Sequence, residues 1–144
     1  MARTREAHPY RRTQILTASP GELMLLLYNA AITCAEQARA TMGRGQFDEA
    51  HVMLVKAENC VMELSSGLRR EVHPELVGNL SRLFEFVFYK LFEGNVSHNT
   101  QCVDDAVNVL NVLRDAWTEA LARVGGAEKG TPGMGESGSV ELSA

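Results

Sequence analysis

The sequence predicts an all-α protein, an antiparallel up-down-up-down four-helix bundle. Four long segments carry apolar residues at helical spacing, and short breaks that contain glycine or proline separate them at about 42–46, 65–74 and 94–99. No run alternates between apolar and polar residues with a period of two, so strands are not expected. Short connections make consecutive helices antiparallel neighbours, which favours a bundle.

One domain accounts for most of the chain. The 144 residues suffice for one ordinary domain, which we expect over residues 19–124. Residues 1–18 are an N-terminal arm rich in arginine. Residues 125–144 hold six glycines and show no periodicity, which predicts a disordered, flexible C-terminal tail.

Composition excludes several classes of function. The net charge of -4 lacks the attraction that nucleic acid demands. The longest apolar run, Leu23–Tyr28, is far shorter than the roughly 20 residues that span a bilayer, and the first residues lead into no apolar signal core. Cys34, Cys60 and Cys102 form no Cys-x-x-Cys pair, which favours a reducing compartment over a disulfide framework. We therefore expect a cytoplasmic protein. We also expect it to be a monomer or a weak homodimer.

The first two helices have clear boundaries. Ser19–Glu22 is a capping box with proline at the first helical position, because the serine hydroxyl and the glutamate carboxylate can satisfy amides that the first turn leaves unpaired. Gly43 and Gly45 separate the first helix from the second, and Gly67 should end the second. The second helix carries a heptad seam that consists of Phe47, Ala50, Leu54, Ala57, Val61, Leu64 and Leu68.

The last two helices are bounded in the same way. His73-Pro74-Glu75 opens the third helix, and Gly94 is predicted to close it. Asn99 or Thr100 opens the fourth, which Gly125-Gly126 is predicted to end. The fourth helix carries a second heptad seam that consists of Val103, Ala106, Leu110, Leu113, Trp117, Ala120 and Val124.

The helices carry more apolar surface than their own packing requires. A bundle helix should bury one stripe and leave the rest polar, whereas these helices have apolar residues beside and opposite their seams. Large contiguous apolar patches on a small domain mark binding surfaces, so we expect the excess to hold another polypeptide. The expected binding residues, from the arm through all four helices, are Tyr10, Ile15, Leu16, Tyr28, Val52, Val55, Met62, Phe84, Phe88, Tyr89, Val109, Val112 and Ala116.

Enzymatic signatures are sparse. The four histidines lie far apart, none stands in a Glu-x-x-His motif, and no glycine-rich phosphate loop follows a strand. We therefore expect no enzyme and no cofactor. Two alternatives to a protein that holds another polypeptide in these surfaces remain: a four-helix phosphotransfer module with His51 as the nucleophile, and a plain helical adaptor protein.

Short motifs extend from the arm to the fourth helix, and their order and spacing over about 10–124 are specific. They are Tyr10, Gln14, Thr17, Ser19-Pro20, Glu22-Leu23, Leu27-Tyr28-Asn29, Ala38, Lys56-Ala57, Glu63-Leu64, Asn79-Leu80, Leu83-Phe84 and Leu113-Arg114-Asp115-Ala116-Trp117. This pattern resembles the FliS family of flagellar secretion chaperones. Two positions depart from it, because the family usually has aspartate where this chain has Asn29 and tyrosine where it has Phe84.

The resemblance implies a cytoplasmic export chaperone for flagellin. An all-helical bundle would bind the C-terminal segment of newly made flagellin, prevent its premature polymerisation and deliver it to the flagellar export gate, a type III secretion apparatus. The arm, with Tyr10, would take part in capping the pocket and in delivery. The resemblance implies neither ATP nor a metal.

Overall fold

The computed structural model describes residues 18–68 and 74–130, with side chains described as far as Gly125, and these residues form four helices and no strand. The all-α prediction is therefore confirmed. The helices are α2 (Pro20–Gly43), α3 (Phe47–Ser66), α4 (Pro74–Ser97) and α5 (Thr100–Gly130).

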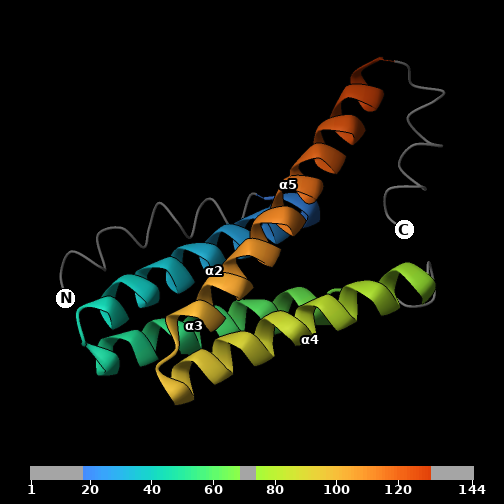
Figure 1. Cartoon of the computed structure of the whole chain (residues 1–144). Coiled ribbons are helices and arrows are strands. Elements are labelled where there is room, and N and C mark those ends of the chain that lie inside the picture. Colours follow the sequence, from blue (N-terminus) through green and yellow to red (C-terminus); the bar gives the residue numbers. More distant parts are fainter. Residues whose placement is uncertain (1–17, 69–73, 131–144) are drawn as a thin grey trace.

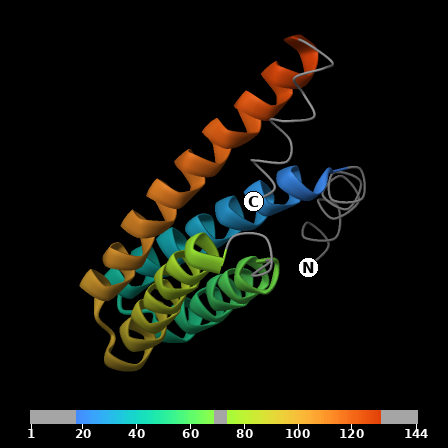
Figure 2. The same cartoon turned by 90° about the vertical axis from the view of Figure 1, so that its right-hand side faces the viewer.

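The four helices form a bundle in which consecutive helices pack side by side and α5 returns against α2 (Figure 1). The first half of α5 packs between α2 and α4. Its second half then departs from the direction of α4 and extends beyond the ends of the other three helices, as Figures 1 and 2 both show. The bundle is therefore closed at the end that holds the α4–α5 turn and opens toward the other end.

The helix boundaries follow the predicted signals at most ends. The capping box is formed: the Ser19 backbone N–H donates to Glu22 Oε1 at 2.9 Å, and the Glu22 N–H donates to Ser19 Oγ at 3.2 Å. Gly45 adopts a φ of 75° in the α2–α3 turn, which is a conformation that glycine adopts without strain. The Asn99 side chain accepts the backbone N–H of Gln101 at 2.9 Å and so caps the start of α5.

Two predicted helix ends are wrong. Helix α4 continues through Gly94 to Ser97, and Gly94 is buried because α5 passes close to it: a Cβ there would lie 2.9 Å from Val103 Cγ2. The residue with positive φ that ends the helix is His98. Helix α5 continues through Gly125-Gly126 to Gly130, since glycine weakens a helix by about 1 kcal/mol relative to alanine but still supplies its backbone hydrogen bond.

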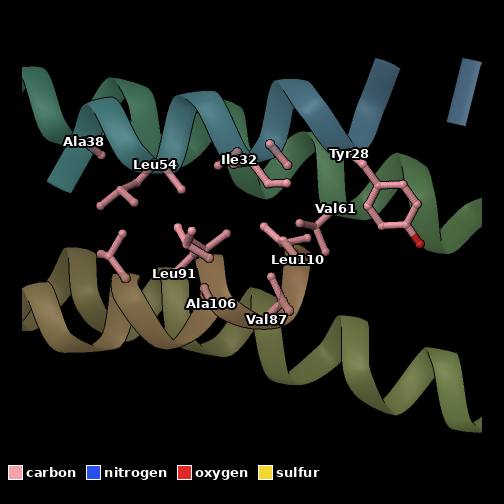
Figure 3. Close-up of a cluster of buried hydrophobic side chains, with 14 of the residues drawn as sticks. Tyr28, Ile32, Ala38, Leu54, Val61, Val87, Leu91, Ala106 and Leu110 are labelled. Atoms are coloured by element: carbon pink, nitrogen blue, oxygen red, sulfur yellow. The ribbon is translucent and has the colours of Figure 1, made fainter. Parts of the chain in front are cut away.

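The core contains side chains from all four helices (Figure 3). The predicted α3 seam is buried from Ala50 to Leu64, and the α5 seam is buried at Val103, Ala106 and Leu110. Farther along α5, Leu113 and Trp117 are only half-buried and pack against the edge of the core. The α5 seam is therefore less buried where the helix diverges from α4.

Candidate functional site

The exposed apolar side chains concentrate on α4. The buried residues of this helix, such as Phe84 and Val87, define the side that faces the core. At 100° per residue, its exposed apolar residues form a continuous arc around the outside of the helix. Leu76, Leu83 and Phe86 lie toward one flank of the buried side and Phe92 lies toward the other, whereas Tyr89 and Val96 lie nearly opposite the core.

The first flank of α4 meets an apolar stripe on α5. The Lys90 ammonium lies 3.4 Å from the Asp105 carboxylate, and this ion pair fixes which sides of the two helices face each other. Lys90 Nζ also lies 5.6 Å from the centre of the Phe86 ring. From the ion pair, apolar residues continue along the same side of each helix at spacings of three, four or seven residues. These six residues, which we name the α4/α5 apolar surface, are Leu76, Leu83 and Phe86 on α4 and Val109, Val112 and Ala116 on α5.

Contacts with α2 hold the second half of α5 in its position. Trp117 Nε1–H donates to the Gly21 carbonyl at 2.8 Å, and Leu121 packs so close to Gly21 that a Cβ would lie 2.5 Å from its side chain. The Arg114 guanidinium donates to Asn29 Oδ1 at 3.3 Å. These contacts tie α5 to the first half of α2 while α4 takes another direction (Figure 2). Val112 is consequently 68% exposed.

A second apolar surface lies along the seam between α3 and α4. The His51–Asn95 contact and the stacked rings of Phe47 and His98, 3.9 Å apart, fix how these helices face each other. We name as the α3/α4 apolar surface the exposed and half-buried residues Val55, Met62, Phe88, Tyr89, Phe92 and Val96. Within the seam is a depression of about 270 Å³, lined by Val61, Met62, Ser65, Phe84, Glu85 and Phe88.

The predicted binding residues divide into four sets. Tyr28 and Phe84 are core residues, 3% and 1% exposed with ring centres 6.2 Å apart, and Phe84 also lines the depression between α3 and α4. Val52 is 50% exposed, but helical geometry places it on the side of α3 opposite the core, apart from both surfaces. The arm residues Tyr10, Ile15 and Leu16 lie outside the described residues. The structure distributes the others between the two surfaces, with Val55, Met62, Phe88 and Tyr89 on one and Val109, Val112 and Ala116 on the other.

The list of expected binding residues omitted the α4 residues that complete these surfaces. Leu76, Leu83 and Phe86 belong to the first surface, and Phe92 and Val96 to the second. Their spacing relative to the buried positions of α4 shows that these residues lie outside the core. The sequence does not show which neighbouring helix each of them lies beside, and the structure supplies this.

His51 is engaged rather than free. The Asn95 side-chain amide donates to His51 Nδ1 at 2.8 Å, across the α3–α4 seam. Within residues 18–68 and 74–130, no group of three or more His, Cys, Asp or Glu side chains is placed to hold a metal ion. Over the same residues, no helix combines the length and hydropathy needed to cross a bilayer.

Comparison with known proteins decides the family. A family model described as "Flagellar protein FliS" matches residues 1–124. The chain belongs to the FliS family. The match to FliS includes the arm and the whole bundle as far as Val124, and this family consists of secretion chaperones rather than enzymes, which disfavours phosphotransfer through His51.

Three curated relatives of this FliS chain carry the same description. It is 27% identical to the flagellar secretion chaperone FliS of Bacillus subtilis strain 168 over 112 residues, which are 78% of this chain and 83% of the relative. It is 33% identical to flagellar secretion chaperone FliSB of Pseudomonas aeruginosa over 104 residues, 72% of this chain and 82% of the relative. It is 26% identical to the flagellar secretion chaperone FliS of Salmonella typhimurium over 106 residues, 73% of this chain and 78% of the relative.

Proposed function

We propose that this FliS chain binds the C-terminal segment of flagellin on the α4/α5 apolar surface, prevents its premature polymerisation and delivers it to the flagellar export apparatus. One observation carries the proposal: two apolar stripes diverge from the Lys90–Asp105 ion pair and remain uncovered by the chain's own described residues. Membership of a family of flagellar secretion chaperones supports flagellin as the client.

The chemistry of the α4/α5 apolar surface suits an unfolded client. A segment that orders only when it assembles must lose conformational entropy on binding, and burial of apolar area offsets that loss without requiring a particular side-chain pairing. The two charges at the closed end, Lys90 and Asp105, already pair with each other. The surface therefore selects for apolar residues rather than for charge.

Release of the client follows from the same chemistry. Binding that depends on mass action is reversed when a competing site lowers the free chaperone or client, so the export apparatus can take over the segment without hydrolysis of a nucleotide. We place the complex in the bacterial cytosol, where the client is synthesised. Tyr10, Ile15 and Leu16 of the arm stay predicted contributors to capping and delivery.

A polymerisation assay tests the proposed function. Purified flagellin of the same organism is mixed with filament seeds and increasing amounts of the full chain, and filament growth is followed by light scattering. We expect growth to stop when chaperone and flagellin are equimolar. Unchanged growth at a several-fold excess of the chain would refute the proposal.

A further inference from the structure

Two of the three cysteines lie in the seam between α2 and α3. Cys34 follows the buried Ala31 of α2 by one turn, and Cys60 follows the buried Ala57 of α3 by one turn. Both cysteines are half-buried and pack against the core, and both are thiols in the structure. The proposed function uses neither of them, so their juxtaposition calls for an explanation of its own.

On α2, Cys34 lies away from the side that faces α5. The Arg39–Asp104 ion pair marks that side. At 100° per residue, Arg39 is about 140° around the helix from Cys34. Because α2 packs mainly against α3 and α5, the half-buried flank that contains Cys34 is the one that α2 shares with α3.

On α3, Cys60 faces α2. The His51–Asn95 contact marks the side of α3 that faces α4, and His51 is about 180° around the helix from Cys60. Gly67 lies two turns after Cys60 on the same flank, and a Cβ at Gly67 would lie 3.5 Å from Met24 Sδ of α2. The two cysteines therefore lie on facing flanks of neighbouring antiparallel helices.

Small side chains allow these two helices to pack closely. The seam is lined by alanines that are at most 2% exposed, namely Ala31, Ala35 and Ala38 on α2 and Ala50 and Ala57 on α3. Without longer side chains between them, two helix axes can approach to about 8 Å, the short end of the usual range. At that separation, facing positions reach the Cα–Cα distances of about 4.4–6.8 Å that a disulfide requires.

The electrostatics of Cys60 indicate the same proximity. Burial raises the pKa of the Cys60 thiol, and the charges of Cys34 and Glu63 raise it further. Like charges have this effect over short distances, about 4–6 Å. The raised pKa keeps Cys60 protonated, so we expect Cys34 to be the sulfur that reacts first with an external oxidant.

We propose that Cys34 and Cys60 are a reversible disulfide site, which joins α2 to α3 when the thiol–disulfide buffer around the protein becomes oxidising. The Cys34 thiolate attacks a small disulfide such as oxidised glutathione, which forms a mixed disulfide and releases one thiolate. The Cys60 sulfur then attacks the Cys34 sulfur, the new S–S bond forms, and the second small thiol leaves with the proton of Cys60. The protein pair loses two electrons, which the small disulfide gains.

The bond would stabilise the bundle without obstructing the client. It closes the loop from Cys34 to Cys60, which restricts the unfolded chain. Neither the α4/α5 nor the α3/α4 apolar surface includes a residue of the α2–α3 seam, so the oxidised chain keeps both surfaces. In a reducing buffer the two thiols are restored.

Equilibration in glutathione buffers tests the proposal. The full chain is incubated at graded ratios of reduced to oxidised glutathione, its remaining thiols are alkylated, and the products are identified by intact mass and peptide mapping. Cys34→Ser removes one member of the pair. Cys102→Ser is the matched control, because this buried cysteine lies at the start of α5, outside the α2–α3 seam.

We expect oxidation to lower the number of alkylated thiols from three to one in a monomer, with Cys34 and Cys60 in one cross-linked peptide. The melting temperature, followed by circular dichroism, should rise by roughly 10 °C and return on reduction. Cys102→Ser should form the same bond. Cys34→Ser should form no intramolecular bond and show no rise.

Three results would overturn this inference. The first is a product with glutathione on separate cysteines and no internal bond, and the second is a bond that includes Cys102. The third is an oxidised chain that melts no higher than the reduced one. The flagellin C-terminal segment should bind both forms within about twofold, and loss of binding on oxidation would contradict the claim that the surfaces stay open. Absence of binding to either form would instead refute the proposed function, and the disulfide result would be unaffected.

Discussion

Substitution of Val112 provides a quantitative test of the α4/α5 apolar surface. Its side chain is 68% exposed in the free chain, so about two thirds of its hydrophobic contribution is available to a client. Val112→Ala removes two methyl groups' worth of apolar surface, which contributes about 1.6 kcal/mol when fully buried, and two thirds of this is about 1.1 kcal/mol. We therefore expect the Kd for the flagellin segment to rise roughly sixfold.

Val112→Glu should have a much larger effect. A carboxylate pressed against an apolar client loses its hydration without gaining a partner, at a cost of several kcal/mol, so binding should weaken by more than about a hundredfold. Neither substitution should unfold the chain, because the residue is on the surface. Urea unfolding and circular dichroism check this point.

The assay is fluorescence anisotropy of a dye-labelled flagellin C-terminal segment titrated with each variant. Val52→Glu is the matched control, since Val52 is 50% exposed on a helix of the same bundle but lies on neither apolar surface. It should bind like the wild type. The reasoning is refuted if Val112→Glu binds within twofold of the wild type, or if the Val52 control is equally weakened.

Three other predictions concern packing and charge. Gly94→Ala should lower the free energy of unfolding by about 1–3 kcal/mol, because the new Cβ would lie 2.9 Å from an α5 side-chain carbon. Gly78→Ala should raise the free energy of unfolding by up to about 1 kcal/mol, because Gly78 has open space around it and alanine favours the helix. Equal effects of the two substitutions in urea unfolding would contradict this. Trp117→Phe should cost about 1 kcal/mol through loss of the bond to the Gly21 carbonyl, and an unchanged urea midpoint would argue against that contact. Burial raises the pKa of Glu58 above its usual value of 4.5, so the folded state binds this proton more tightly than the unfolded state and loses stability as pH rises from the unfolded-state pKa through the folded-state pKa. Glu58→Gln should therefore be more stable than the wild type at about pH 7 and equally stable near pH 3. A variant that is less stable than the wild type at neutral pH would refute the reasoning.

Local signals in the sequence were sufficient for the fold. The capping box at Ser19 and the heptad seam of α3 depend on residues three to seven positions apart, and the structure confirms both. Gly94 shows where such signals fail. A glycine near the expected end of a helix resembles a cap, whereas here it makes room for Val103 of the next helix. That role depends on tertiary contact, which no local pattern reports.

The sequence predicted the type of site, an apolar binding surface, but it located only some of the residues that form it. An excess of apolar residues indicated a binding surface, and Val112 and Met62 are indeed among the most exposed apolar side chains. Tyr28 and Phe84 are 3% and 1% exposed, because an aromatic residue at helical spacing suits the core as well as a surface. The divergence of α5 from α4 depends on the fit of Trp117 against Gly21, 96 residues away in sequence, and therefore could not be read from periodicity.

Titration calorimetry at several temperatures tests the central claim most directly, because it reports the apolar area that a client covers. The flagellin C-terminal segment is titrated into the full chain, and the heat-capacity change of binding is obtained from the temperature dependence of the enthalpy. We predict a one-to-one complex with a strongly negative heat-capacity change that Val112→Glu abolishes. The absence of binding at micromolar concentrations, or binding with a heat-capacity change near zero, would contradict the account.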